Sequence, residues 1–441
     1  MLIYPKFGFS GSLVSHMPLG PLYASIDAIK AGFEIDFLDV RLNPDSWRER
    51  LSSMIGADTL LVGISVWTGA PILSALEISR WLKQKHPGVP VVWGGPHAAF
   101  DATDILSEPS VEYAISGYGS VPLAELAKTL SGAEGALPLG EIPGLVYRGA
   151  DGVPREVAKS PEFERTDYRD IPYDLLARDL DRYGQLGRAR RIFSLYSAMG
   201  CPYQCSFCSS PAQYRPMKKK YIPYTAADVV DHIQHAKEKY GAEYIYFIDD
   251  DSFVKLDHVE AIIDEINRRG IKIGLGFRGA RISEIKRMSD EFLTKLARAG
   301  TDIMHIGAES GSQKILNLIR KNCTVQDIID VNRKMARHPE ISAAYNWIVG
   351  LPGETLEDLR ATQQLMLQVV EDNPRAILFI PNKFRPLPGT ELYELALRHG
   401  YKRPQNLEEW AQHGRARLHA GGEAADAHRQ LVGARRGVSL P

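Results

Sequence analysis

The stretch Met199-Gly200-Cys201-Pro202-Tyr203-Gln204-Cys205-Ser206-Phe207-Cys208 decides the fold and the chemistry expected of this chain. Its cysteines follow the spacing C-x-x-x-C-x-x-C, and three thiols cannot all pair as disulfides. A short loop can instead point all three sulfurs into one cavity. Cysteine thiolates are the usual ligands of iron–sulfur clusters, so three of them on a four-iron cluster leave one iron open. An open coordination position is where metal chemistry takes place.

Two simpler interpretations of these cysteines are a structural zinc site and inert buried thiols. Zinc would need a fourth ligand at a matching pair spacing. The only other cysteine is Cys323, far along the chain, and no histidine lies close to the triplet in sequence. We interpret Cys323 as a small buried hydrophobic residue. The spacing therefore favours a cluster on Cys201, Cys205 and Cys208.

The composition is that of a globular enzyme. A chain of 441 residues suggests two or three domains. Hydrophobic residues at 44% and charged residues at 24% are ordinary globular values. A formal net charge of −1 gives no reason to expect a nucleic acid or an anionic membrane as partner. Four cysteines, three of them clustered, indicate a reducing compartment, and we find neither a signal peptide nor an apolar run of membrane-spanning length. We predict a cytoplasmic protein.

Residues 1–148 alternate between strand and helix signals, which predicts a doubly wound parallel sheet. Ligands of such sheets bind at the carboxyl ends of the strands. Three glycine-bearing turns are expected there, Ser65–Gly69, Gly94–His97 and Gly117–Ser120. Each alone is explained as a turn, but three at corresponding strand ends favour a ligand, because glycine allows close backbone approach. The candidate ligand-binding residues are Ser65, Gly94, Gly95, Gly117 and Gly119.

The rest of the chain divides into three parts. Residues 149–191 carry several prolines and a weak pattern, which predicts a surface linker. Residues 192–400 contain about six strand–helix units, too few for a closed eight-stranded barrel. Residues 401–441 form a C-terminal segment whose composition turns rich in Ala, Gly, Arg and His after about residue 412. We expect that end to be truncated, frame-shifted or a natural flexible tail.

The cysteine spacing, with Phe207 just before the third cysteine, resembles the signature of radical S-adenosylmethionine (SAM) enzymes. The resemblance implies a partial (β/α)6 barrel over residues 192–400 and a [4Fe-4S] cluster on the three cysteines. In that family the open iron binds the amino and carboxylate groups of SAM. The reduced cluster then cleaves SAM to methionine and a deoxyadenosyl radical. An electron donor such as flavodoxin or ferredoxin is implied as a partner.

The N-terminal part resembles the cobalamin-binding domain that precedes many radical SAM barrels. The resemblance lies in the order of Met17-Pro18-Leu19-Gly20, Asp39, Gly94-Gly95-Pro96-His97 and Gly117-Tyr118-Gly119. The cobalamin motif D-x-H-x-x-G, whose histidine ligates cobalt, is absent. The resemblance therefore implies cobalamin without a histidine from that motif, and we interpret His97 as a pocket-wall or turn residue.

The resemblance also suggests which residues contact SAM. Glu309, next to small residues after a predicted strand, would hold the ribose hydroxyls, and Ser310 would add a hydrogen bond. Arg278 or Arg281 would pair with the SAM carboxylate, since arginine binds carboxylates in a bidentate way. The remaining candidates are Asp250 at the amino group, Gly350 in the adenine-side turn and Phe207 packed on the adenine.

Each polar candidate has a structural alternative. Asp250 or Ser252 would equally serve as the N-cap of the next helix, and Glu309 has the same alternative. Glu354 would be a favourable negative charge at a helix start. The Lys218-Lys219-Lys220 run is interpreted as a solvated loop.

The family resemblance predicts an enzyme that methylates an unactivated carbon of a small molecule or natural-product intermediate, with cobalamin carrying the methyl group. Relatives with the same two domains perform oxidative cyclisation or rearrangement instead, including anaerobic magnesium-protoporphyrin ester cyclases. A truncated, non-catalytic binding protein is a third possibility. A methylthiotransferase is disfavoured because no second cysteine cluster is present in the sequence.

Overall fold

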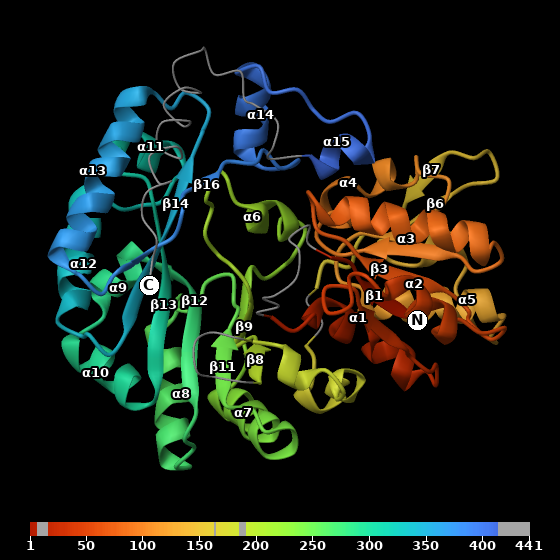
Figure 1. The fold of residues 1–441 in the computed structure, drawn as a ribbon, viewed down its shortest axis with the longest axis horizontal. Helices are drawn as coiled ribbons and strands as arrows, with labels where there is room; N and C mark the ends of the chain where they lie inside the picture. The colour runs from red at the N-terminus through yellow and green to blue at the C-terminus, as the bar shows by residue number, and fades with distance from the viewer. Residues whose placement is uncertain (7–15, 163–164, 185–190, 413–441) are drawn as a thin grey trace.

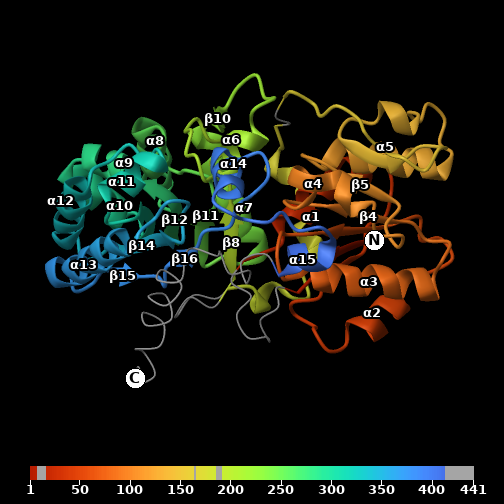
Figure 2. The same ribbon diagram turned by 90° about the horizontal axis from the view of Figure 1, so that it is seen from above.

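The computed structural model describes residues 1–6, 16–162, 165–184 and 191–412. Two α/β domains lie side by side, an N-terminal sheet domain and a curled sheet that forms part of a barrel (Figure 1). The last two helices run back from the barrel towards the N-terminal domain (Figures 1 and 2). The expected tail beyond residue 412 lies outside the described residues.

The N-terminal domain is built on a seven-stranded sheet in the order β2-β1-β3-β4-β5-β6-β7. Strands β1 to β5 pair in parallel, as the sequence predicts for a doubly wound fold. The last two strands are antiparallel, which the sequence did not indicate. The strand bounds are β1 Leu2–Tyr4, β2 Phe37–Asp39, β3 Val62–Ser65, β4 Val91–Gly94, β5 Tyr113–Ile115, β6 Leu145–Arg148 and β7 Pro154–Glu156.

Helices cover both faces of this sheet. One buried core joins the sheet to α2, α3 and α4, and a second joins it to α5. Helix α1 contacts α5, and its Leu22 and Ile26 belong to the large core of the barrel domain, so α1 ties the two domains together. The helix bounds are α1 Leu19–Lys30, α2 Trp47–Met54, α3 Pro71–Lys85, α4 Ala98–Ile105 and α5 Ser120–Ser131.

The predicted linker, residues 149–191, differs from expectation. Strand β7 extends the N-terminal sheet past the predicted boundary at residue 148. Three short 3-10 turns follow, at Tyr168–Asp170, Tyr173–Leu176 and Leu180–Arg182. Aromatic and leucine side chains of this segment are buried in the large core: Tyr173, Leu176, Leu180 and Tyr183. The described part of the segment is therefore packed against the domains and is not an exposed linker.

The second domain is a curled parallel sheet in the order β15-β14-β13-β12-β11-β8, with β16 beside β14. This is the open partial barrel that the sequence predicts. The strand bounds are β8 Ile192–Leu195, β11 Tyr244–Phe247, β12 Gly274–Arg281, β13 Thr301–Glu309, β14 Ser342–Val349, β15 Ile377–Leu378 and β16 Asn382–Lys383.

Helices α7 to α13 cover the outside of the barrel sheet (Figure 1). Several start at a hydroxyl N-cap that accepts a backbone N–H, as at Thr225, Ser289, Thr324 and Thr355. The helix bounds are α7 Ala226–Tyr240, α8 Leu256–Arg268, α9 Ile282–Arg287, α10 Asp290–Arg298, α11 Gln313–Leu318, α12 Val325–Ala336 and α13 Leu356–Asp372.

The cysteine loop follows β9 (Ala198–Gly200), which pairs in antiparallel fashion with β10 (Tyr221–Pro223) further along the chain. The loop runs into the short helix α6 (Ser209–Gln213), which lies between the two domains in both ribbon views (Figures 1 and 2). The loop is thus held beyond the carboxyl end of β8, the end at which barrel enzymes carry their active sites.

The two helices of the C-terminal segment pack on different domains. Helix α14 (Glu391–Arg398) packs on the barrel core, whereas α15 (Leu407–Ala411) packs on α3 of the N-terminal domain. Trp410 is 1% exposed within that N-terminal core. Ion pairs from Glu408 to Arg80 and from Arg403 to Asp101 fasten the same contact. Leu407, Trp410 and Ala411 are therefore part of the N-terminal domain's core, whereas the sequence predicts only a C-terminal segment there.

Candidate active site

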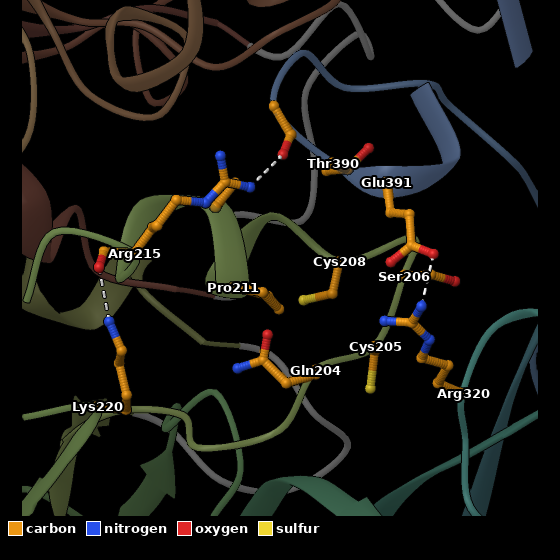
Figure 3. A pocket seen from close by; sticks show the side chains of 12 residues that line it. Gln204, Cys205, Ser206, Cys208, Pro211, Arg215, Lys220, Arg320, Thr390 and Glu391 are labelled. Carbon is orange, nitrogen blue, oxygen red and sulfur yellow. Dashed lines mark hydrogen bonds and ion pairs between the residues drawn. The ribbon is translucent and has the colours of Figure 1, made fainter. Parts of the chain in front are cut away.

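The three clustered cysteines lie on one loop between the domains. Cys205 is buried, and Cys201 and Cys208 are partly exposed. A cavity of about 160 Å³ opens beside the loop and is lined by Cys205 and Cys208 together with side chains of α6 and of the segment before α14 (Figure 3). Phe207 packs against the barrel core, and the backbone N–H of Cys208 donates to the carbonyl of Cys205, so the loop is folded back on itself.

A buried arginine contacts the cysteine loop. Arg281 Nη1 donates to Cys205 Sγ at 2.9 Å, and its Nη2 donates to the carbonyl of Lys321 at 2.6 Å. The guanidinium lies 4.1 Å from the centre of the Tyr203 ring. This contact ties the cysteine loop to the carboxyl end of β12. The sequence makes this arginine a candidate for the SAM carboxylate, but its two terminal nitrogens donate to Cys205 and to the Lys321 carbonyl instead.

The donor set of this loop fits an iron–sulfur cluster. Burial raises the pKa of the Cys201 and Cys208 thiols, so without a metal both hold their protons at neutral pH. A bound metal reverses that preference, because a coordinating thiol is deprotonated outright. Across the described residues, no three His, Cys, Asp or Glu side chains are grouped closely enough to hold an ion.

The three consecutive aspartates after β11 lie in different environments. Asp249 is 1% exposed and accepts hydrogen bonds from the backbone N–H groups of Ser197 and Ala198, which fixes the start of β9. Burial raises the pKa of Asp249 to about 6. Asp251 is buried as well, whereas Asp250 is exposed and accepts from the Tyr214 hydroxyl at 2.5 Å. Helix α8 begins after Lys255, so the alternative in which Asp250 or Ser252 caps it is wrong.

Glu309 ends β13 in a left-handed conformation, with φ of 66°. Its carboxylate pairs with Lys321 Nζ at 2.8 Å, and both side chains are under 10% exposed. Helix α11 is capped by Ser312, so Glu309 is not a helix cap. Lys321 was not found from the sequence, because a lysine in a loop after a short helix carries no local signal of burial. Together, Arg281 and Lys321 link Cys205 to Glu309.

The neighbouring candidates have different environments. Ser310 is fully buried, and its hydroxyl is engaged with Thr362 Oγ1 of α13 at 3.1 Å, a packing role rather than an open ligand-facing one. Gly350 follows β14 with φ of 81°, and its N–H donates to Glu354 Oε2. Glu354 therefore holds the Gly350 turn closed, and burial raises its pKa to about 7. It is not simply a charge at a helix start.

Only some of the glycine turns of the N-terminal domain leave space around the glycine for a ligand. A Cβ on Gly95 would lie 2.9 Å from the Val66 nitrogen, and one on Gly119 would lie 3.2 Å from Ala24 Cβ, so packing explains both glycines. Gly94 has only one neighbour at the limit of contact, and Gly117 meets only the flexible end of Lys159. These two positions leave the more open approach at the strand ends. The Ser65 hydroxyl lies beside Gly95 in the same turn system.

His97 is a buried residue in the turn between β4 and α4. Its Nδ1 shares a hydrogen bond with Thr68 Oγ1 at 3.2 Å, and its ring lies 5.7 Å from Trp410 of α15. The side chain is 1% exposed.

Tyr118, in the glycine turn after β5 of the N-terminal domain, contacts the barrel domain close to the cysteine loop. Tyr118, between Gly117 and Gly119, interacts with the Tyr214 hydroxyl, which in turn donates to Asp250. Burial, with the Asp250 charge, raises the pKa of both tyrosines. The turn after β5 and the end of β11 thus meet at one place, next to α6.

Comparison with known proteins identifies both halves of the chain. Residues 195–366 match the radical SAM superfamily, and residues 13–127 match the B12 binding domain. The chain is 30% identical over 343 residues to an uncharacterized methyltransferase of Pyrococcus horikoshii, covering 77% of this chain and 70% of the relative. The chain belongs to the B12-binding radical SAM enzymes.

Other members of this family are more distant. The chain is 26% identical over 393 residues to the anaerobic magnesium-protoporphyrin IX monomethyl ester cyclase of Cereibacter sphaeroides, covering 88% of this chain but 62% of the cyclase. The structure of the radical SAM methyltransferase TsrM of Kitasatospora setae, with cobalamin and a [4Fe-4S] cluster bound, shares the fold at a TM-score of 0.66 and 21% identity. That match covers 90% of this chain and 74% of TsrM.

Membership of this family settles the cofactors. The enzyme uses a [4Fe-4S] cluster, SAM and cobalamin. Within the described residues, none of the helices is long and apolar enough to cross a bilayer.

Proposed function

We propose that this B12-binding radical SAM enzyme methylates an unactivated carbon of a small molecule or natural-product intermediate. The observation that carries the proposal is the contact of Tyr118 with Tyr214 beside Asp250, which brings a B12-domain turn next to the cysteine loop. A methyl group carried on cobalamin would then lie near the place where SAM is cleaved. The relatives named as methyltransferases support the same reaction.

In this proposal Cys201, Cys205 and Cys208 hold the cluster, and Glu309 holds the SAM ribose. Phe207, Asp250 and the Gly350 turn complete the SAM site. Arg281 and Lys321 are positioning residues, because they fix Cys205 and Glu309. When bound, the cluster supplies an electron to SAM and cobalamin supplies the methyl group. Gly94 and Gly117 would admit the corrin or its nucleotide tail, with Ser65, Gly95 and Gly119 shaping the turns.

The electron must come from a partner. Exposed basic residues near the cysteine loop, Arg215, Lys218 and Lys219, would suit an acidic protein such as flavodoxin or ferredoxin. Lys218 is paired with Glu162, so the surface is only moderately positive. We expect a cytoplasmic setting, because both the cluster and its reductants need reducing conditions.

A cobalamin-dependent radical cyclase is the second candidate. It is favoured by the resemblance to the C. sphaeroides cyclase, which extends over 88% of this chain. A non-catalytic binding protein is the third, and turnover of SAM would contradict it.

The test is anaerobic reconstitution with iron, sulfide and hydroxocobalamin, followed by reaction with SAM whose methyl group carries deuterium. Methylation predicts S-adenosylhomocysteine, deoxyadenosine and a product that carries the label. A cyclase predicts deoxyadenosine with unlabelled, oxidised product. Absence of deoxyadenosine from a protein that holds its full cluster would refute both reactions.

A further inference from the structure

The inner face of the barrel carries a connected group of rings and one cation. We call His16, Tyr246, Arg278, His305 and Phe379 the lumen cluster. Side chains alternate between the two faces of a strand. Phe247, Phe277 and Met304 pair across β11, β12 and β13 and are buried in the core under the helices. Their neighbours Tyr246, Arg278 and His305 therefore face the barrel interior.

The rings of the lumen cluster are arranged to hold a flat molecule. His16 and Tyr246 have ring centres 5.3 Å apart at an angle of 19°, and Tyr246 meets His305 edge-on at 5.6 Å. His305 stacks on Phe379 at 5.1 Å and 20°. These are ordinary stacking distances, and a planar group can join such an array. His16 comes from the N-terminal domain, so both domains contribute to this wall.

Arg278 supplies the charge of the lumen cluster. Its residue is exposed although it lies within β12. In the described part of the chain, its guanidinium has neither a hydrogen-bond acceptor nor an ion-pair partner, whereas Arg281 three residues later donates through both Nη1 and Nη2. Burial, assisted by the Arg278 charge, lowers the pKa of His16 and of His305 to about 4. Both histidines are neutral at pH 7, so Arg278 remains the cation among these rings.

We propose that the lumen cluster is the substrate anchor, in which Arg278 pairs with a carboxylate, phosphonate or sulfonate and the rings stack on a planar part of the same molecule. Arginine presents a planar fork that binds such anions through two parallel hydrogen bonds. The inference rests on the proposed function, which supplies a small-molecule substrate to the barrel. It replaces the assignment of Arg278 to the SAM carboxylate. Arg278 follows Phe277, whose partner on β13 is Met304, and Met304 precedes the strand end at Glu309 by five residues, so Arg278 lies deeper in the barrel.

The probes are a matched pair, 8-anilinonaphthalene-1-sulfonate and its uncharged counterpart N-phenyl-1-naphthylamine. Their fluorescence is titrated with reconstituted holoprotein at constant ionic strength. Arg278→Gln should weaken binding of the sulfonate about ten- to a hundredfold, the range for losing a hydrogen bond to a charged group. The neutral probe should bind as before. Arg287→Gln, which removes the same charge from an exposed position on α9, should change neither affinity.

The binding of SAM decides between the two roles of Arg278. The proposal predicts that Arg278→Gln keeps its SAM affinity. A loss of SAM affinity with unchanged sulfonate binding would overturn it and return Arg278 to the SAM site. Equal sulfonate affinity in the Arg278→Gln and Arg287→Gln variants would overturn it as well. Deoxyadenosine formation in the unmodified protein is scored separately, so a failure of the proposed function is seen independently of probe binding.

Discussion

The buried pair of Glu309 and Lys321 gives the sharpest prediction about stability. At 2.8 Å, the attraction between the two charges is about 6 kcal/mol with an effective dielectric constant near 20. Desolvation offsets several kcal/mol for each ion, so the intact pair contributes little net stability. Replacing Lys321 with Met removes one partner and leaves a buried carboxylate. We expect this to cost about 3–5 kcal/mol of the free energy of unfolding.

The cost should also depend on pH in a definite direction. In Lys321→Met, the folded-state pKa of Glu309 should rise above its unfolded value, because the carboxylate is buried without a partner. A raised folded pKa of an acid means that stability falls as pH rises through it. In the unmodified protein burial acts most strongly and lowers the pKa of Lys321, but the charge and hydrogen bond of Glu309, together with Cys205, outweigh it and the net pKa is raised. The stability from that amine is therefore present below its unfolded pKa and lost at higher pH.

The assay is urea denaturation followed by near-ultraviolet circular dichroism between pH 5 and pH 8. The double variant Glu309→Gln with Lys321→Met is the control, because it removes both charges together. It should be less destabilised than Lys321→Met and should lack the pH dependence. The account of a buried pair would be refuted if Lys321→Met lowered the free energy of unfolding by less than about 1 kcal/mol and if that free energy did not change with pH.

Three further changes test the remaining structure. Trp410→Ala should lower the free energy of unfolding by about 3–5 kcal/mol, because it removes a large buried side chain from the N-terminal core. The measurements are the unfolding temperature and the retention of hydroxocobalamin, and both should fall. Normal values for both would show that the packing of α15 is not needed for stability. Gly95→Ala should destabilise the same domain, because its Cβ would meet the Val66 backbone at 2.9 Å, and a stable variant in a denaturation experiment would contradict that clash. Glu354→Ala should weaken SAM binding in an equilibrium titration by opening the Gly350 turn, whereas Glu354→Gln, which retains an acceptor oxygen, should be close to normal; equal loss in both would assign the effect to charge instead.

The regular parts of the barrel were predictable because their patterns are long and local. Strand β14 (Ser342–Val349) and helix α12 (Val325–Ala336) are two of the strand–helix elements that the sequence predicts within residues 192–400. Helix α12 begins at a capping box and β14 carries an eight-residue strand pattern, so sequence and structure agree at both. The partial barrel follows from the count of such units.

The contacts that join distant segments could not be predicted. The packing of Trp410 on the N-terminal core links residues more than three hundred positions apart, and no local pattern indicates it. Strand β7 of the β6–β7 hairpin lies in a proline-containing stretch whose sequence is typical of a linker. In the site, the cysteine loop was evident from its spacing, whereas the partner of Glu309 was not. Lys321 is recognisable only once the fold has buried it beside that carboxylate.

The most direct test of the central claim is the iron content of anaerobically reconstituted protein and of its four single cysteine variants. The account predicts about four irons per chain in the unmodified protein, with cluster absorbance and deoxyadenosine formation. Cys201→Ala, Cys205→Ala and Cys208→Ala should each lose the cluster and SAM cleavage, and Cys323→Ala should retain both. Loss of the cluster in Cys323→Ala alone, or a full cluster in any of the other three, would contradict the assignment.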